Sequence, residues 1–578
     1  MPPARLTRIL VSLLALVAVI SLWVFRPVLA NGFLHWDDHI YLAELIRMGR
    51  FSLSSLRWMW TSLQPFYLQP IIWMTQMTDY QLWGLDPMGH HATNWMLHGV
   101  YVVLVGTLVW QLTSTVAAVY DRRNFEEKST TGARRAPLQQ EERLAMSVGI
   151  ALLCGIHPLQ VEPVAWLSAR NALLCSAWMV AALCTYLRAV GSGETKRGWW
   201  WATIILQTIA LLTKPSALSF PLVMLAVDFF PLRRHMGRSW WSLVREKWLM
   251  IAVSAAAAVG AISASDRLEG LQEYTLGARL LVAARGSVFY LWKLVWPAWL
   301  SPFYPLSNRV SLWNVEFLVP VLVCVVVTLI AVWQRKRAPV LLAAWVSYLA
   351  LLLPLLGVVQ VGGQAVADRY AYLAMVPILL ALGSGALWIW RRRQVSIRIT
   401  LCVVVVACLM FLGQRTREQI AVWHDDISLW GAILSHFPND PLANYNLAVA
   451  LLKAERLPEA RDRAERAVAY SDPHTPHLPM ARETLGVIYL ATHQYGPAVE
   501  QLQQVVAADP TLWAAQYNLA CAYTRMGHLE EGYDVLQALI AKQPEYAAAA
   551  ARDAQLAALR NEPDYNARFA TLIDGAKR

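Results

Sequence analysis

Two stretches decide the fold class of this chain: residues 9–29, ILVSLLALVAVISLWVFRPVL, and residues 315–333, VEFLVPVLVCVVVTLIAVW. Each is long enough, or nearly so, to cross the hydrocarbon core of a bilayer, roughly 30 Å thick, as one helix. Hydrophobic residues fill 57% of the 578 positions and charged residues only 15%. Soluble domains carry about 25% charged residues. The sequence therefore predicts an all-α, multi-pass membrane domain.

About eleven apolar runs are predicted to span the membrane. They lie near residues 9–30, 91–113, 145–160, 171–189, 199–213, 216–231, 248–264, 315–333, 338–356, 370–390 and 398–414. Lys and Arg gather in the short loops on one side of these runs, which the positive-inside rule assigns to the cytoplasm. The N-terminus is therefore expected inside and the C-terminal domain outside. This topology also explains the net charge of +11, so no nucleic acid partner is expected.

One further segment, residues 278–299, is apolar enough to enter the membrane. A full span there would invert every later loop and turn the basic triplet 335–337 outward, against the positive-inside rule. We therefore expect an interfacial or re-entrant helix, with its tryptophans at the level of the lipid head groups.

The C-terminal part carries a helical repeat. Pro510 and Pro544 lie 34 residues apart, as do Gly486 and Ala520. This period is typical of tetratricopeptide repeats, in which paired helices cross at small residues. The expected domains are a membrane domain (1–414, first outer loop 31–90), a connecting helix (415–440), three repeats (441–544) and capping helices (545–578). We expect the repeats to hold a peptide or protein; a rigid spacer or dimerisation arm is the alternative.

Polar side chains gather at the turns that this topology places outside. Charges beside apolar spans are costly and tend to be functional where they are retained. The catalytic candidates are Asp37 and Asp38, and the cations that could hold a phosphate are Lys214 and Arg369. The supporting candidates are His157, Glu162, Arg170, Asp368 and Tyr370.

Each candidate also has a structural explanation. An acidic side chain could cap the helix expected near Ile40, and a lysine could extend to lipid head groups. Asp368 and Arg369 could form an ion pair that orients their loop. His157, next to a proline, could donate a hydrogen bond at a helix end.

Four motifs carry a resemblance to a known family. They are the acidic pair at 37–38, HPLQVEPVAW at 157–166, the Lys214-Pro215 turn before DFFPLR at 228–233, and ADRYAYL at 367–373. In combination they resemble the transmembrane and tetratricopeptide-repeat (TMTC-like) proteins, whose eukaryotic members are protein O-mannosyltransferases of the GT-C fold. The resemblance implies a polyprenyl-phosphate-linked sugar donor, transfer at the extracytoplasmic face, and a catalytic base in the first outer loop.

The residues fit that chemistry, because attack by a hydroxyl needs a base, and the departing phosphate needs cations. Two adjacent carboxylates could raise the pKa of one of them or share a divalent cation, Mg or Mn, through Asp37 and Asp38; both alternatives stay open here. We expect a glycosyltransferase whose repeats recruit a protein acceptor. It would lie in a bacterial inner membrane, with periplasmic repeats.

A non-catalytic membrane scaffold, whose repeats assemble an envelope complex, is the alternative function. A transporter fits less well, because the charges lie at one interface and not near the midplane of the membrane.

Overall fold

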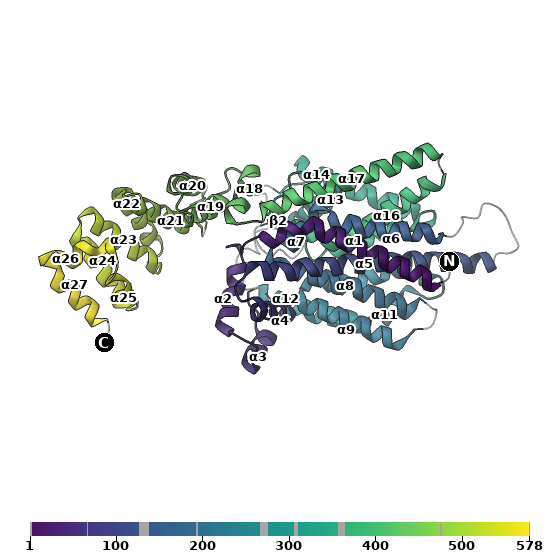
Figure 1. Cartoon of the computed structure of the whole chain (residues 1–578), viewed down its shortest axis with the longest axis horizontal. Helices are drawn as coiled ribbons and strands as arrows, with labels where there is room; N and C mark the ends of the chain where they lie inside the picture. Colours follow the sequence, from purple (N-terminus) through teal and green to yellow (C-terminus); the bar gives the residue numbers. More distant parts are fainter. Residues whose placement is uncertain are drawn as a thin grey trace. The chain divides into compact units, whose positions relative to one another are not determined.

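The computed structural model describes residues 3–65, 67–126, 138–191, 195–265, 275–305, 310–356, 364–392, 394–473, 475 and 477–576. The described chain is almost entirely helical, as predicted (Figure 1). It divides into two compact units, Met1–Asp425 and Asp426–Arg578. We describe each unit by itself.

The first unit contains long apolar helices, short 3-10 helices (η) and one pair of short strands. Its elements are α1 (Pro3–Phe25), η1 (Arg26–Ala30), α2 (Asp38–Met48), α3 (Leu53–Thr61), α4 (Pro70–Trp83), α5 (Pro87–Glu126), α6 (Gln140–Ile156), η2 (Pro158–Gln160), α7 (Val161–Ala165), η3 (Leu167–Ala169), α8 (Arg170–Val190), α9 (Arg197–Thr213), η4 (Pro215–Ser219), α10 (Phe220–Phe229), η5 (Arg234–Met236), α11 (Trp240–Glu246), α12 (Trp248–Ser265), α13 (Leu276–Val295), β1 (Tyr304–Pro305), α14 (Val315–Trp333), η6 (Gln334–Lys336), α15 (Pro339–Leu352), β2 (Gln364–Val366), η7 (Asp368–Tyr370), α16 (Ala371–Arg392) and α17 (Val395–Val422).

Six helical segments among the described residues are long and apolar enough to cross a membrane, so the chain is a multi-pass membrane protein. They are Ala4–Ala30, Pro87–Ala118, Leu167–Val190, Val315–Lys336, Asp368–Arg391 and Val395–Val422. Two pairs of helices bent by 63° bring the number to eight. Each of the eleven expected spans coincides with a helix, but this count is lower than eleven. The reason is that Pro215 and Pro339 each begin an apolar helix too short for a straight crossing.

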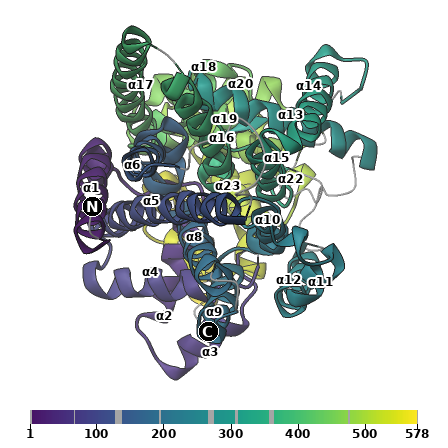
Figure 2. The same ribbon diagram turned by 90° about the vertical axis from the view of Figure 1, so that its right-hand side faces the viewer.

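The centre of this unit is α5, which packs against α1, α6 and α8. Figure 2 shows α5 crossing the middle of the bundle, with α6 on one side and α8 and α9 on the other. Glycines permit the closest of these approaches. A Cβ atom at Gly155 would lie 2.1 Å from the Ser21 hydroxyl oxygen, and one at Gly106 would lie 2.3 Å from a methyl group of Leu14. These small residues let α1 lie directly on α5 and α6.

The segment expected at the interface, residues 278–299, corresponds to α13, which packs against α14. It is followed by β1, which pairs antiparallel with β2, Tyr304 lying opposite Val366. This pairing connects two loops that are distant in the sequence and places η7, with Asp368 and Arg369, directly after a strand.

The second unit is a series of helix pairs. Its elements are α18 (Asp426–His436), α19 (Pro441–Lys453), α20 (Leu457–Tyr470), α21 (His477–Ala491), α22 (Tyr495–Ala508), α23 (Trp513–Met526), α24 (Leu529–Lys542), α25 (Tyr546–Ala550), η8 (Ala554–Leu556), α26 (Ala557–Asn561) and α27 (Pro563–Gly575). Successive pairs cross at small residues, since a Cβ atom at Gly486 would lie 2.7 Å from Leu502. The three pairs from α19 to α24 follow the 34-residue period seen in the sequence.

Candidate functional site

The first residue of the acidic pair has a partly accessible carboxylate. Asp37 precedes α2 and is half-buried, and its side chain makes no capping hydrogen bond to that helix. Helix capping therefore does not explain this residue. Burial raises the pKa of Asp37 to about 6, and the nearby charge of Arg369 opposes part of that shift. A carboxylate with this pKa can accept a proton near neutral pH.

The second residue of the pair is fully buried and holds the loop in place. One oxygen of Asp38 accepts hydrogen bonds from the backbone N–H of Ser168 (3.0 Å) and from its hydroxyl group (2.5 Å). The other oxygen accepts one from the backbone N–H of Leu34 (3.0 Å). Burial also raises the pKa of Asp38 to about 6, although these hydrogen bonds oppose the shift. Asp38 thus fastens the first outer loop to η3 and orients its neighbour.

A buried carboxylate holds the loop arginine. Glu162, in α7, accepts a hydrogen bond from the backbone N–H of Arg369 (2.7 Å) and forms an ion pair with its guanidinium group. The guanidinium carbon lies 5.3 Å from the ring centre of Trp166 and 5.2 Å from that of Tyr370. Glu162 therefore fixes the position of a cation that stays partly exposed, with 13% of its side-chain surface accessible.

A second cation lies beside this pair. Lys214 follows α9 and is half-buried, and its electrostatic neighbours include Arg369, Glu162 and Cys175. Burial and the charge of Arg369 lower the pKa of Lys214 to about 8. No carboxylate among the described residues lies within 4.0 Å of its ammonium group in a salt bridge. Lys214 and Arg369 thus share the single carboxylate of Glu162, and the surplus positive charge favours an anion beside them.

Asp368 lies behind the arginine and supports its loop. It is buried, and its carboxylate accepts a hydrogen bond from the Tyr304 hydroxyl (2.9 Å). The ion pair considered for Asp368 and Arg369 is thus replaced by Asp368 with Tyr304 and Arg369 with Glu162. The hydroxyl of Tyr370 accepts a weak hydrogen bond from Gln364 (3.4 Å).

Two other candidates do not reach the accessible part of the site. The ring of His157 accepts a hydrogen bond from the backbone N–H of Leu159 (3.2 Å), and its other nitrogen lies 3.1 Å from the carbonyl oxygen of Leu294. Arg170 is fully buried and forms an ion pair with Asp79 (2.5 Å). Both side chains hold the turns on which the site is built.

Several residues near the site were not among the candidates. Asp79 was missed although it is a carboxylate in the apolar stretch 70–83, the signal used for the others. The Tyr67 hydroxyl accepts a hydrogen bond from Asn171 (3.1 Å) and lies close to Arg369 electrostatically. Ser168 and Tyr304 carry no charge, so only the fold reveals their carboxylate partners.

The residues do not fit the divalent cation considered for the acidic pair. Both oxygens of Asp38 already accept hydrogen bonds from Leu34 and Ser168, which leaves Asp37 as the accessible carboxylate. The described part of the chain contains no group of three or more His, Cys, Asp and Glu residues that could hold a metal ion.

Comparisons with known proteins agree with both parts of this architecture. A sequence model of the tetratricopeptide repeat matches residues 492–569. The chain is 22% identical over 392 residues, which are 66% of its length, to Protein O-mannosyl-transferase F38B6.6 of Caenorhabditis elegans. It is 29% identical over 136 residues, 24% of its length, to Protein O-mannosyl-transferase Tmtc3 of Drosophila melanogaster. These matches confirm the predicted resemblance to the TMTC-like family. The matched part covers 51% of the first relative and 14% of the second.

Proposed function

We propose that the chain is an integral-membrane glycosyltransferase that moves a sugar from a polyprenyl-phosphate-linked donor to a protein hydroxyl. The observation that carries this proposal is the convergence of Asp37, Lys214 and Arg369 from three separate turns of the membrane unit. The similarity to two proteins named O-mannosyl-transferases supports a glycosyltransferase-like role at the level of the family.

The proposed reaction uses these residues in two roles. The acceptor hydroxyl attacks the anomeric carbon of the sugar and gives its proton to the carboxylate of Asp37. The bond between the sugar and the phosphate oxygen breaks at the same time, and the lipid phosphate leaves with the bonding electrons. Lys214 and Arg369 stabilise the negative charge of that phosphate. The partial burial of all three side chains strengthens these electrostatic interactions relative to water.

The second unit is proposed to recruit the protein acceptor. Tetratricopeptide repeats form extended concave surfaces that bind peptides and proteins. The basic loops favour an orientation with the N-terminus in the cytoplasm and the candidate site outside. In a bacterial inner membrane the site and the repeats would then face the periplasm, where folded and unfolded acceptors pass.

The test is transfer of radiolabelled sugar from polyprenyl-phosphate donors to membrane proteins by the purified full chain. We compare the natural chain with Asp37→Asn and with a control, Asp86→Asn, which changes an acid in the turn before α5. Label that is lost in the first variant and kept in the control supports the proposal. Absence of label with every donor sugar, from a folded chain, would contradict it and favour the scaffold function.

A further inference from the structure

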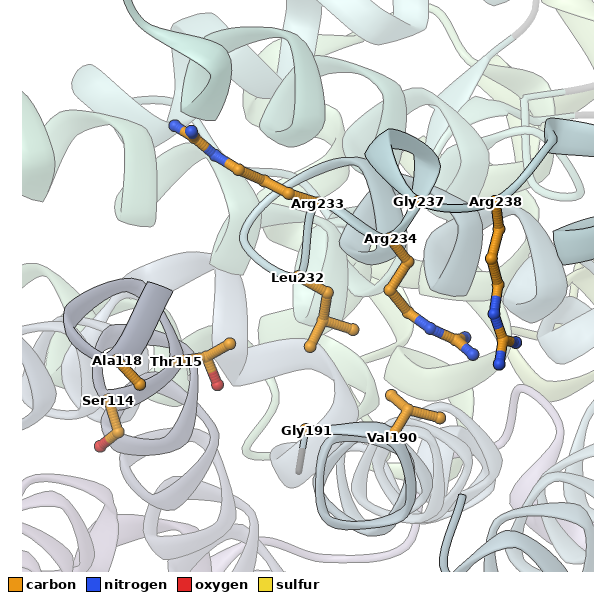
Figure 3. Close-up of a pocket in the computed structure, with 10 residues that line it drawn as sticks. All are labelled: Ser114, Thr115, Ala118, Val190, Gly191, Leu232, Arg233, Arg234, Gly237 and Arg238. Atoms are coloured by element: carbon orange, nitrogen blue, oxygen red, sulfur yellow. The ribbon is translucent and has the colours of Figure 1, made fainter. Parts of the chain in front are cut away.

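A second polar cavity lies at the opposite end of the membrane unit from the candidate site. The helix α8 begins beside that site at Arg170 and runs for 21 residues, about 30 Å, to Val190. There the ends of α5 and α8 and the loop before α11 enclose a cavity of about 500 Å³. Its lining is Ser114, Thr115, Ala118, Val190, Gly191, Leu232, Arg233, Arg234, Gly237 and Arg238 (Figure 3).

The loop wall of this cavity carries a surplus of positive charge. Arg234 bonds both oxygens of Glu246 (3.0 and 2.8 Å), and Arg238 bonds the same carboxylate (2.7 Å). Lys247 and Arg234 both pair with the buried Asp228 (2.5 and 3.2 Å). Three cations thus share two carboxylates, and the neighbouring arginine at position 233 adds a further positive charge. Figure 3 shows Arg234 and Arg238 extending side by side toward Val190.

Arg233 itself adopts an unusual backbone conformation. Its φ angle is 53°, in the left-handed region that glycine or asparagine adopts more readily. Such a conformation costs free energy, and strained residues of this kind gather at ligand-binding sites. In Figure 3 its side chain extends away from the other two arginines. The three guanidinium groups therefore surround the cavity wall from different directions.

An apolar cavity continues from the polar one toward the interior of the bundle. It measures about 600 Å³ and shares Ser114 and Thr115 with its neighbour. Its other walls come from α1, α5 and α8, and they include Leu10, Leu14 and Val103. Ser114 accepts a hydrogen bond from Arg143, whose guanidinium carbon lies 4.1 Å from the ring centre of Trp110 in the same wall. A cationic end thus joins an apolar groove between membrane helices.

We propose that this double cavity binds an anionic glycerophospholipid. The phosphate head group would lie among the arginines and the hydroxyls of Ser114 and Thr115, because planar guanidinium groups match phosphate oxygens in pairs. One acyl chain would occupy the groove between α1, α5 and α8. In the orientation proposed above, this end faces the cytoplasm, where anionic lipids attract basic segments. The inference does not depend on the proposed transferase activity.

The experiment is native mass spectrometry of the purified full chain titrated with dioleoyl phosphatidylglycerol, dioleoyl phosphatidylcholine and glycerol 1-phosphate. We expect the natural chain to prefer phosphatidylglycerol. The double variant Arg233→Gln, Arg238→Gln should lose roughly 30-fold of that affinity, since each basic residue near a lipid surface contributes about a factor of five. The control Arg335→Gln, Lys336→Gln removes the same charge from another basic loop and should change the affinity by less than about twofold.

Three outcomes would overturn the proposal. Equal loss in the control would mean general attraction of anionic lipid to basic loops. Equal binding of glycerol 1-phosphate would mean a soluble phosphate ligand, for which the apolar groove has no role. If the double variant fails to fold, Val11→Trp, in the groove wall of α1, decides the question. That change should weaken phosphatidylglycerol binding at least several-fold, and unchanged binding would contradict the lipid assignment.

Discussion

Glu162 binds both the backbone N–H and the guanidinium group of Arg369, a residue 207 positions later in the chain. This contact joins the turn after α6 to the turn after β2. It also decides the character of the site, because the one carboxylate engages one cation and leaves Lys214 beside it without a salt-bridge partner among the described residues. A phosphate group would complete this arrangement.

The two carboxylates of the acidic pair should behave differently when each is changed. Asp37→Asn should abolish sugar transfer and leave the melting temperature nearly unchanged, because its side chain bonds no backbone group. Asp38→Asn should lower the free energy of unfolding by about 1–3 kcal/mol, because an amide cannot accept all three buried hydrogen bonds. Transfer assays and thermal unfolding of the detergent-purified variants measure both effects. Full transfer by Asp37→Asn would remove it as the base.

The rate of transfer should show a bell-shaped dependence on pH. Asp37 acts as a base only when it is deprotonated, so the rate should rise as the pH passes its pKa of about 6. Lys214 holds phosphate only when it is protonated, so the rate should fall above its pKa of about 8. Lys214→Arg should remove the alkaline limb, because arginine stays charged there. An alkaline limb that persists in this variant would assign that limb to another group.

Lys214→Ala should weaken binding of the polyprenyl-phosphate sugar by roughly tenfold or more, because a hydrogen bond to a charged group contributes about 1.5–3 kcal/mol. Lys196→Ala is the matched control, since Lys196 precedes the same helix, α9, at its other end. Donor affinity can be measured by displacement of a fluorescent analogue. Equal affinities in the two variants would exclude Lys214 from the phosphate site.

The buried pair of Arg170 and Asp79 should be structural. Arg170→Gln leaves a buried carboxylate without its cation and should destabilise the fold by about 3–5 kcal/mol. The double variant Arg170→Gln, Asp79→Asn removes both charges and should recover part of that loss. Thermal unfolding of the three proteins measures the coupling. A neutral effect of the single change would mean that the pair is solvated in the folded protein.

Transfer should continue in the presence of a metal chelator. The oxygens of Asp38 are engaged by backbone and hydroxyl donors, so Asp37 offers a cation too few ligands. We expect the same initial rate after treatment with EDTA as with added Mg. Loss of activity with EDTA, restored by Mg or Mn, would show that the donor phosphate brings a cation into the site.

The sequence was sufficient for the class of fold. Membrane helices follow from the length of apolar runs, and the repeats follow from a period of 34, and both are local properties of the chain. It also indicated that the turns with Asp37, Glu162, Lys214 and Arg369 meet at one end, since the topology places them on one side. Their residue types then suggested a base and cations for a phosphate.

What the tertiary structure alone decided is the partner of each charge. Asp37 and Asp38 are identical and adjacent in the sequence, yet one is accessible and the other is bonded to Ser168, 130 residues away. The same holds for Asp368 with Tyr304 and for Arg170 with Asp79. Hydrogen bonds and ion pairs act over a few ångströms in space, and neighbours across helix ends leave no periodic signal in the order of residues. The fold therefore separates the carboxylate that can react from the one that holds the loop.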